Sequence, residues 1–104
     1  MDALTTDTFD EVIASSDLPV LVDLWAQWCQ PCHALAPVLE SVEASHGDRL
    51  RIVKVDVDAE PDLARRYDVM SFPTLLLFRD GEVVRRLVGA RGKQRLLEDL
   101  ADVL

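Results

Sequence analysis

The stretch "VLVDLWAQWCQPCHALAPVL", residues 20–39, joins a strand-like pattern to a helix-like one. Its apolar beginning belongs to a run at residues 19–26 that contains β-branched residues, which is typical of a strand buried on both faces. Cys29 and Cys32, the two cysteines of the chain, follow this run directly. From residue 32 to residue 47, apolar residues recur at helical spacing. The stretch therefore predicts a buried strand, a turn that carries two cysteines, and a helix.

The segments on both sides of this stretch show the same two kinds of pattern. Apolar residues at helical spacing predict helices, and apolar or alternating runs predict strands. The further elements expected are a helix at residues 6–16, a strand at 51–58, a short helix at 59–69, strands at 73–78 and 82–88, and a helix at 93–104. Asp80 and Gly81 form a hairpin signal between the last two strands. Gly47 is expected to end the helix that follows the cysteines.

The order of these elements predicts an α/β fold. Two consecutive strand–helix–strand steps favour parallel pairing with helices on both faces of the sheet, and the closing hairpin adds an antiparallel pair. We therefore expect a central mixed β-sheet flanked by helices on both faces, in a single domain that spans residues 1–104. Ligands of such sheets usually meet the carboxyl ends of the central strands, where the cysteines lie.

Composition and charge exclude several classes of function. The chain has 19 acidic and 11 basic residues and a net charge of −8, which disfavours a nucleic-acid partner. The longest wholly apolar run, residues 75–78, is too short to span a membrane, and the N-terminus does not resemble a secretory signal. Two cysteines three residues apart cannot staple distant parts of a fold, which favours a reducing compartment. A cytoplasmic protein is expected.

The spacing of Cys29 and Cys32 favours redox chemistry. Residues three apart at a helix start lie on one face, close enough to form a disulfide. Cys29 falls at or just before the first turn, where unpaired N–H groups and the helix dipole stabilise a thiolate. Cys32 lies one turn further in and should remain a thiol until needed. We therefore expect Cys29 to attack a substrate disulfide and Cys32 to resolve the mixed disulfide.

Two metal-dependent alternatives must be weighed against the dithiol. The string "CQPCH", residues 29–33, also fits a c-type haem attachment site, for which Met70 could be nominated as a second axial ligand. The two flanking tryptophans, the unbroken apolar strand upstream and the lack of an export signal argue against haem. A zinc site lacks a second Cys/His pair to complete four ligands. The dithiol is preferred, and neither a metal nor another cofactor is expected.

Four segments together resemble the thioredoxin family. They are "VLVDLWAQWCQPC" at residues 20–32, "KVDVD" at 54–58, "FPTLLLFRDGEVV" at 72–84 and "VGA" at 88–90. Their order and spacing fit the classical single-domain type, here with a WCQPC active site, over nearly the whole chain. The resemblance implies a thioredoxin fold and a small, monomeric dithiol–disulfide oxidoreductase. Such an enzyme reduces protein disulfides and is itself re-reduced by an NADPH-dependent reductase.

Asp23 is the candidate that interrupts the apolar strand before the cysteines. Burial of a lone carboxylate is costly and raises its pKa. The resemblance places a buried acid here, beneath the second cysteine, as a proton acceptor acting through water. The alternative is a carboxylate paired with Lys54 on a neighbouring strand. Both can hold, because a lysine matching Lys54 sits near that acid in the family.

The resemblance also implies a substrate surface around the dithiol. Its residues are Trp28, Gln30, Pro31, Phe72, Pro73, Gly89 and Ala90. Phe72–Pro73 would be a cis peptide opposite the dithiol, where the backbone of residue 72 can pair with an extended substrate. Trp28 would form an apolar rim, and Gly89 would allow close backbone approach. The simpler alternatives are an ordinary strand start at Pro73 and an ordinary strand end at Gly89.

Three features depart from the family pattern. Gln30 stands where glycine is usual and His33 where lysine or arginine is common, so the reduction potential can differ from that of relatives. The first family strand is expected to be curtailed to residues 2–5.

Two rival functions are a chaperone-like binding module that uses the groove around Trp28 and Phe72, and a more oxidising thiol oxidase or isomerase. Both cysteines being present favours an enzyme.

Overall fold

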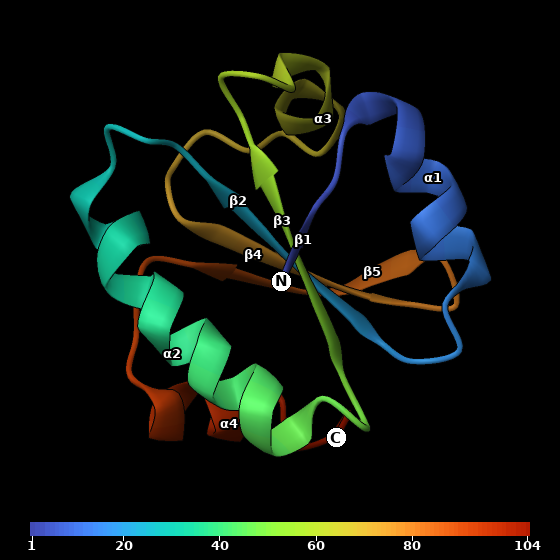
Figure 1. Cartoon of the computed structure of the whole chain (residues 1–104), viewed down its shortest axis with the longest axis vertical. Helices are drawn as coiled ribbons and strands as arrows, with labels where there is room; N and C mark the ends of the chain where they lie inside the picture. Colours follow the sequence, from blue (N-terminus) through green and yellow to red (C-terminus); the bar gives the residue numbers. More distant parts are fainter.

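A mixed sheet with helices on both sides forms the centre of the computed structural model, which describes residues 1–104 (Figure 1). Its strands are β1 (Asp2–Ala3), β2 (Val20–Trp25), β3 (Arg51–Asp56), β4 (Thr74–Arg79) and β5 (Glu82–Val88). They lie in the order β1-β3-β2-β4-β5. Both β1 and β2 pair in parallel with β3, whereas β4 is antiparallel to β2 and β5. The predicted α/β fold with a mixed sheet is confirmed.

The helices are α1 (Thr6–Ser15), α2 (Gln30–His46), α3 (Pro61–Arg66) and α4 (Lys93–Asp99). Figure 1 views the sheet along its edge, with α1 and α3 on one side and α2 and α4 on the other. Two buried clusters fill the spaces between these layers. One combines α1 and α3 with residues such as Val22 and Val53, and the other combines α2 and α4 with Leu21 and Leu75. Both faces of the sheet are therefore buried at its central strands, which explains the near-continuous apolar run of β2.

Alternation along β2 decides which helical layer each side chain meets. Val20, Val22 and Leu24 belong to the cluster under α1 and α3, whereas Leu21 belongs to the cluster under α2 and α4. Successive side chains of a strand point to opposite faces. Asp23 therefore faces the same layer as Leu21, the layer that contains the helix with the cysteines.

The prediction that the second strand–helix–strand step, from β3 through α3 to β4, adds another parallel strand is wrong. Thr74 pairs with Leu24 and Phe78 with Val20, so β4 enters the sheet at the carboxyl end of β2 and runs back along it. The helix in the connection between β3 and β4, α3, has only six residues, about 9 Å of helix, against about 20 Å for a six-residue strand. Figure 1 shows α3 near the end of the sheet where the arrow of β3 finishes. The chain therefore turns back at the end of the sheet where β3 finishes.

Smaller differences from the expected elements occur where helices and strands end. Because the Oδ1 of Asp56 accepts the backbone N–H of Asp58, β3 turns away before residue 58. Gly47 caps α2 with a right-handed φ of −63°, and a Cβ there would lie 2.6 Å from the Glu43 carbonyl oxygen. Its lack of a side chain, and not a left-handed turn, suits it to this position. The last helix ends at Asp99, and the residues beyond it form turns.

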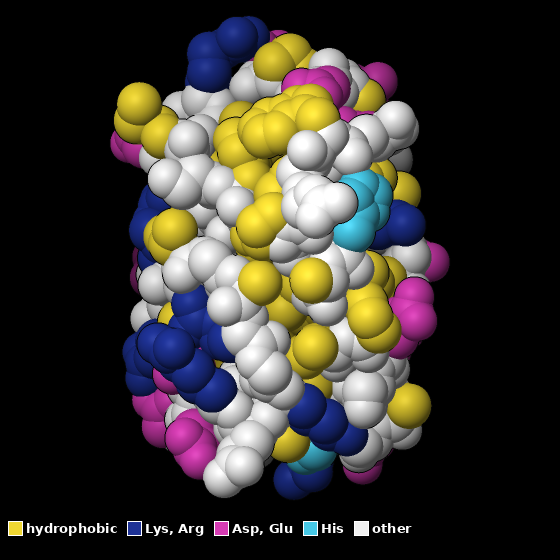
Figure 2. Space-filling model, turned by 90° about the vertical axis from the view of Figure 1, so that its left-hand side faces the viewer, with side chains coloured by type: hydrophobic (Ala, Val, Ile, Leu, Met, Phe, Trp, Pro, Cys, Tyr) yellow, Lys and Arg dark blue, Asp and Glu magenta, His cyan; other side chains and the backbone are white.

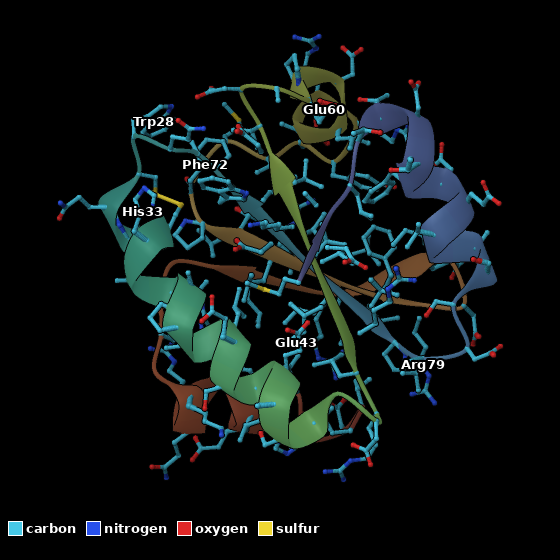
Figure 3. The ribbon with its side chains drawn as sticks, viewed as in Figure 1. Trp28, His33, Glu43, Glu60, Phe72 and Arg79 are labelled. Atoms are coloured by element: carbon cyan, nitrogen blue, oxygen red, sulfur yellow. A yellow bond between two sulfur atoms is a disulfide. The ribbon has the colours of Figure 1, made fainter.

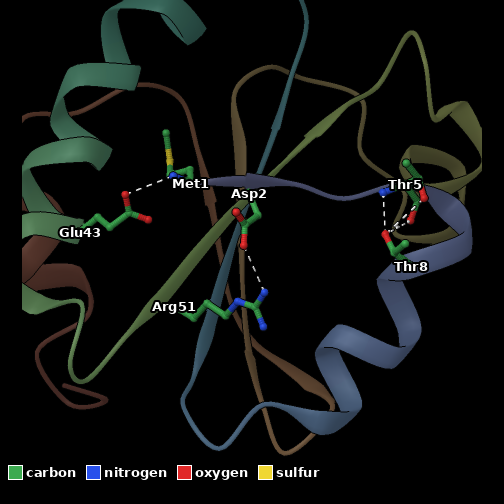
Figure 4. Close-up of polar contacts among 6 residues, drawn as sticks. All are labelled: Met1, Asp2, Thr5, Thr8, Glu43 and Arg51. Atoms are coloured by element: carbon green, nitrogen blue, oxygen red, sulfur yellow. Dashed lines mark hydrogen bonds and ion pairs between the residues drawn. The ribbon is translucent and has the colours of Figure 1, made fainter.

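The short β1 is confirmed and is held mainly by contacts at its ends. It pairs with only Val53 and Lys54 of β3. Figure 4 shows the Met1 ammonium bound to Glu43 of α2 at 3.2 Å and Asp2 bound to Arg51 of β3 at 3.4 Å. It also shows Thr5 and Thr8 at the start of α1, where their side chains form a capping box.

None of the four helices has both the length and the apolar character needed to cross a membrane.

Phe9 provides a test of the packing of α1. Its ring is buried and lies edge-on to Phe78 at 5.6 Å and tilted against Tyr67 at 5.7 Å. We expect Phe9→Ala to lower the free energy of unfolding by about 3–5 kcal/mol, measured by urea denaturation. Met70→Ala, at a side chain that is 88% exposed, should change it by no more than about 0.5 kcal/mol. Equal stabilities for the two variants would contradict this packing.

Candidate active site

The turn between β2 and α2 places Cys29 at the start of a helix, as expected. Cys29 is the N-cap residue of α2, and its Sγ accepts the backbone N–H of Cys32 at 3.2 Å. Pro31 lies in the first turn, where a missing N–H breaks no helical bond. The Cys29 sulfur therefore occupies the position at which a helix N-terminus stabilises negative charge once the sulfur is reduced.

Cys29 and Cys32 form a disulfide, with their Cα atoms 5.3 Å apart. The expected difference in depth is small in this oxidised form, because the two residues are 4% and 3% exposed. They differ in their neighbours: Cys32 lines a pocket that is partly open to solvent, and Cys29 does not. The pair can accept two electrons and return them by thiol–disulfide exchange.

Asp23 is buried at the side of β2 that faces α2. Only 4% of the residue is exposed, and its Oδ1 has no hydrogen-bond partner. Burial raises its pKa from 3.8 to about 7, although the positive charge of Lys54 acts in the opposite direction. The predicted location and the direction of the pKa shift are confirmed.

Lys54 lies directly beside Asp23 in the register of β2 and β3. The two side chains are nevertheless not within ion-pair distance, and the Lys54 Nζ lies 5.8 Å from the centre of the Trp25 ring. The simple alternative of a paired carboxylate is therefore not seen. Lys54 acts on Asp23 through its charge at longer range.

Asp23 and Cys32 both line a cavity of about 170 Å³. A single water needs only about 10–15 Å³ of such volume, so the cavity has room for water. Ala36 and Glu40 of α2 line the cavity from the helix side, and Met1 closes it from the N-terminus. Sequence reasoning missed these three. Ala36 and Glu40 follow Cys32 at steps of four, so helical spacing could have placed them on its face.

An exposed tryptophan and a half-buried phenylalanine form an aromatic pair next to the disulfide. Trp28 is 65% exposed and meets the Phe72 ring edge-on at 5.7 Å. Its Nε1 donates a hydrogen bond to Asp58 Oδ2 at 3.0 Å. Figure 3 shows Trp28, Phe72 and His33 around the disulfide, and in Figure 2 hydrophobic side chains gather on the upper part of this face. Asp58, which follows β3 at the carboxyl edge of the sheet, was missed.

The loops before β4 and after β5 meet on the same side as this pair. The Phe72–Pro73 peptide bond is cis, as expected. The Pro73 carbonyl accepts the Gly89 N–H at 2.9 Å, and Gly89 has a φ of +95°, in the region that favours glycine. Ala90 is exposed next to it. Gln30 and Pro31 are exposed in the first turn of α2.

His33 lies on the outer side of the active-site turn. Its Nε2 donates to the Gln27 carbonyl oxygen at 2.6 Å, and its ring lies edge-on to Trp25 at 6.0 Å. His33 also lines the cavity that contains Asp23. No group of three or more His, Cys, Asp or Glu side chains is arranged to hold a metal ion.

Comparisons with known proteins agree on one family. The family model described as Thioredoxin matches residues 1–102. A thioredoxin of Mycolicibacterium smegmatis is 52% identical over 104 residues, which cover 98% of this chain and 93% of the relative. A thioredoxin of Mycobacterium tuberculosis is 48% identical over 101 residues, 97% of this chain and 87% of the relative. The same identity and chain coverage are found with a bifunctional thioredoxin reductase/thioredoxin of Mycobacterium leprae, of which 22% is matched.

The raised pKa of Asp23 predicts how stability depends on pH. Between about pH 4 and pH 7 the folded protein retains a proton that the unfolded chain releases, so the free energy of unfolding falls as pH rises. Above pH 7, where the buried carboxyl group is ionised, this decrease in the free energy of unfolding reaches roughly 4 kcal/mol at most. We expect oxidised Asp23→Asn to lose this dependence and to exceed the stability of the wild type above pH 7, measured by urea unfolding from pH 4 to pH 8.

The matched control is Asp48→Asn, which changes a carboxylate on the protein surface. It should leave the pH dependence of the wild type intact. A constant stability difference between Asp23→Asn and wild type across this pH range would show that Asp23 does not titrate there.

Proposed function

The chain belongs to the thioredoxin family and is a thiol–disulfide oxidoreductase, and we propose that it reduces protein disulfides, with Cys29 as the attacking thiolate and Cys32 as the resolving thiol. The observation that carries this assignment of roles is the position of Cys29 as the N-cap of α2, where its sulfur accepts the Cys32 N–H. A negative sulfur is stabilised there more than one turn further along the helix.

The reaction balances in two exchange steps. The Cys29 thiolate attacks one sulfur of the substrate disulfide, forms a mixed disulfide and releases a first substrate thiolate. Cys32 then loses its proton, and its thiolate attacks the Cys29 sulfur. The mixed disulfide breaks, the second substrate thiolate leaves, and the Cys29–Cys32 disulfide closes. Two electrons pass to the substrate, and its two thiolates take up protons.

Asp23 is the proposed acceptor of the Cys32 proton. A pKa of about 7 leaves its carboxyl group partly ionised near neutral pH, so it can take up a proton and release it again. The cavity it shares with Cys32 has room for a connecting water. Lys54 is proposed to tune this acid, because its charge lowers the pKa that burial raises.

The proposed substrate surface surrounds the disulfide. It consists of Trp28, Gln30, Pro31, Phe72, Pro73, Gly89 and Ala90. The contact between Trp28 and Phe72 and the hydrogen bond between Pro73 and Gly89 support one continuous surface. Its apolar rim would exclude water from the exchange, and its exposed backbone would pair with an extended peptide.

We propose that an NADPH-dependent thioredoxin reductase returns the electrons. The bifunctional relative of Mycobacterium leprae, whose name combines a reductase with a thioredoxin, supports this pairing. The two sulfurs hold both electrons, so the proposed mechanism uses no further cofactor. We further propose a cytoplasmic monomer with one thioredoxin domain at residues 1–104. Its net charge of −8 argues against nucleic acid as a partner.

Substitution of each cysteine distinguishes their roles. With insulin as substrate and dithiothreitol as electron source, we expect Cys29→Ser to reduce no faster than the reaction without protein. Cys32→Ser should instead accumulate a mixed disulfide with the substrate through Cys29, detected by mass spectrometry. Wild-type activity in Cys29→Ser would overturn the assignment of the nucleophile, and a strongly oxidising potential against glutathione would favour an oxidase or isomerase.

Substitution of Asp23 should slow the resolving step selectively. We expect Asp23→Asn to lower the rate of mixed-disulfide resolution roughly 10- to 100-fold at pH 7, near the lower end for general bases because thiols ionise readily. Rapid quenching and mass spectrometry separate this step from the initial attack. Asp48→Asn is again the control. An unchanged resolution rate in Asp23→Asn would remove Asp23 from the mechanism.

A further inference from the structure

Arg91, which follows the Gly89–Ala90 turn, has a nearly buried guanidinium. Its side chain is 8% exposed, and its Nη1 binds Asp99 Oδ2 at 2.7 Å. Its Nη2 donates to the Val88 carbonyl oxygen at 2.8 Å and to that of Gly89 at 3.3 Å, and its Nε lies 3.4 Å from the same Gly89 oxygen. One side chain thus joins the end of β5, the turn after it and the last residue of α4.

These contacts fix the direction of the peptide group between Gly89 and Ala90. The carbonyl of Gly89 and the N–H of Ala90 belong to one planar trans peptide, so they point in opposite directions. With the carbonyl held against Arg91, the N–H points away from the guanidinium. The Ala90 N–H has no hydrogen-bond partner in the chain, and Ala90 is exposed. An unused donor is therefore held at the edge of the proposed substrate surface.

The anchor of this arrangement is rigid, and arginine suits it. Leu96 of α4 and Leu100, which directly follows the helix, are fully buried, which fixes Asp99 relative to the sheet. The planar fork of arginine can bind the carboxylate and two carbonyl oxygens together, whereas lysine offers one point charge. The hydrogen bond from Gly89 to Pro73 is the other backbone tie of the turn.

We propose that Arg91, held by Asp99, is a positioning residue that presents the Ala90 N–H to a backbone carbonyl of a protein substrate lying beside the disulfide. This inference rests on the substrate surface assigned under the proposed function. It makes Arg91 a determinant of substrate class: a protein or peptide disulfide has a main chain that reaches the turn, and a small aromatic disulfide does not. Arg91 has no part in the sulfur chemistry itself.

The test compares two substrates of Arg91→Lys. With insulin, we expect KM to rise about tenfold with kcat unchanged, the effect of losing one well-placed hydrogen bond. With 5,5′-dithiobis(2-nitrobenzoate), mixed with protein that has been reduced and freed of dithiothreitol, the rate constant should stay within about twofold of wild type. Asp99→Asn, which keeps Arg91, should shift KM in the same direction and provides a second variant if Arg91→Lys is unstable.

Arg85→Gln is the matched control. Arg85 also lies on β5, binds the C-terminal segment through Asp102 and donates to a backbone carbonyl, that of Val84, at 2.8 Å. It makes no hydrogen bond to the turn at residues 88–90. We expect its KM for insulin to equal that of wild type, and thermal unfolding of all variants checks that the fold is kept.

Two outcomes would overturn the inference: an unchanged KM for insulin in folded Arg91→Lys and Asp99→Asn, or an equal loss of rate with both substrates. Trp28→Ala separates this failure from failure of the substrate surface. A raised KM in Trp28→Ala with an unchanged KM in Arg91→Lys rejects only the role of Arg91. An unchanged KM in both variants rejects the surface itself.

Discussion

The burial of β2 between two helical layers is the constraint on which the active site depends. Apolar side chains on both faces of this strand fix its position, and the chain leaves it directly into α2. The same packing places Cys29 at the N-cap of α2 and buries Asp23. One packing arrangement therefore controls two electrostatic properties: the stability of a negative sulfur and the affinity of a nearby carboxyl group for its proton.

The buried carboxyl group of Asp23 lowers the stability of the fold, and its proposed function explains why it is retained. A residue such as leucine at position 23 would remove the desolvation of a carboxylate, yet it would also remove the proton acceptor that we propose for Cys32. Lys54 reduces the cost without forming an ion pair, so the carboxyl group remains able to change its protonation state near neutral pH. Active sites commonly retain such locally unfavourable groups.

The sequence was most informative where a local pattern and its physical cause coincide. The apolar run of β2, the Asp80–Gly81 hairpin and the cysteine spacing each predicted the observed structure. The direction of β4 could not be predicted in this way, because it depends on where α3 lies at the end of the sheet. The places of Met1 and Glu40 in the cavity and of Arg91 beside the turn after β5 could not be predicted either. Each depends on contacts between segments far apart in the chain.

The two-residue β1 leaves most of the outer edge of β3 without a neighbouring strand. Open backbone groups on such an edge can recruit a strand from another molecule and so begin aggregation. Here the uncovered part of the edge carries Arg51 and Asp56, and charged side chains oppose that kind of assembly. These residues therefore protect the open edge against pairing with a strand of another molecule. Neutral residues in their place would favour aggregation, an effect that has no connection with redox chemistry.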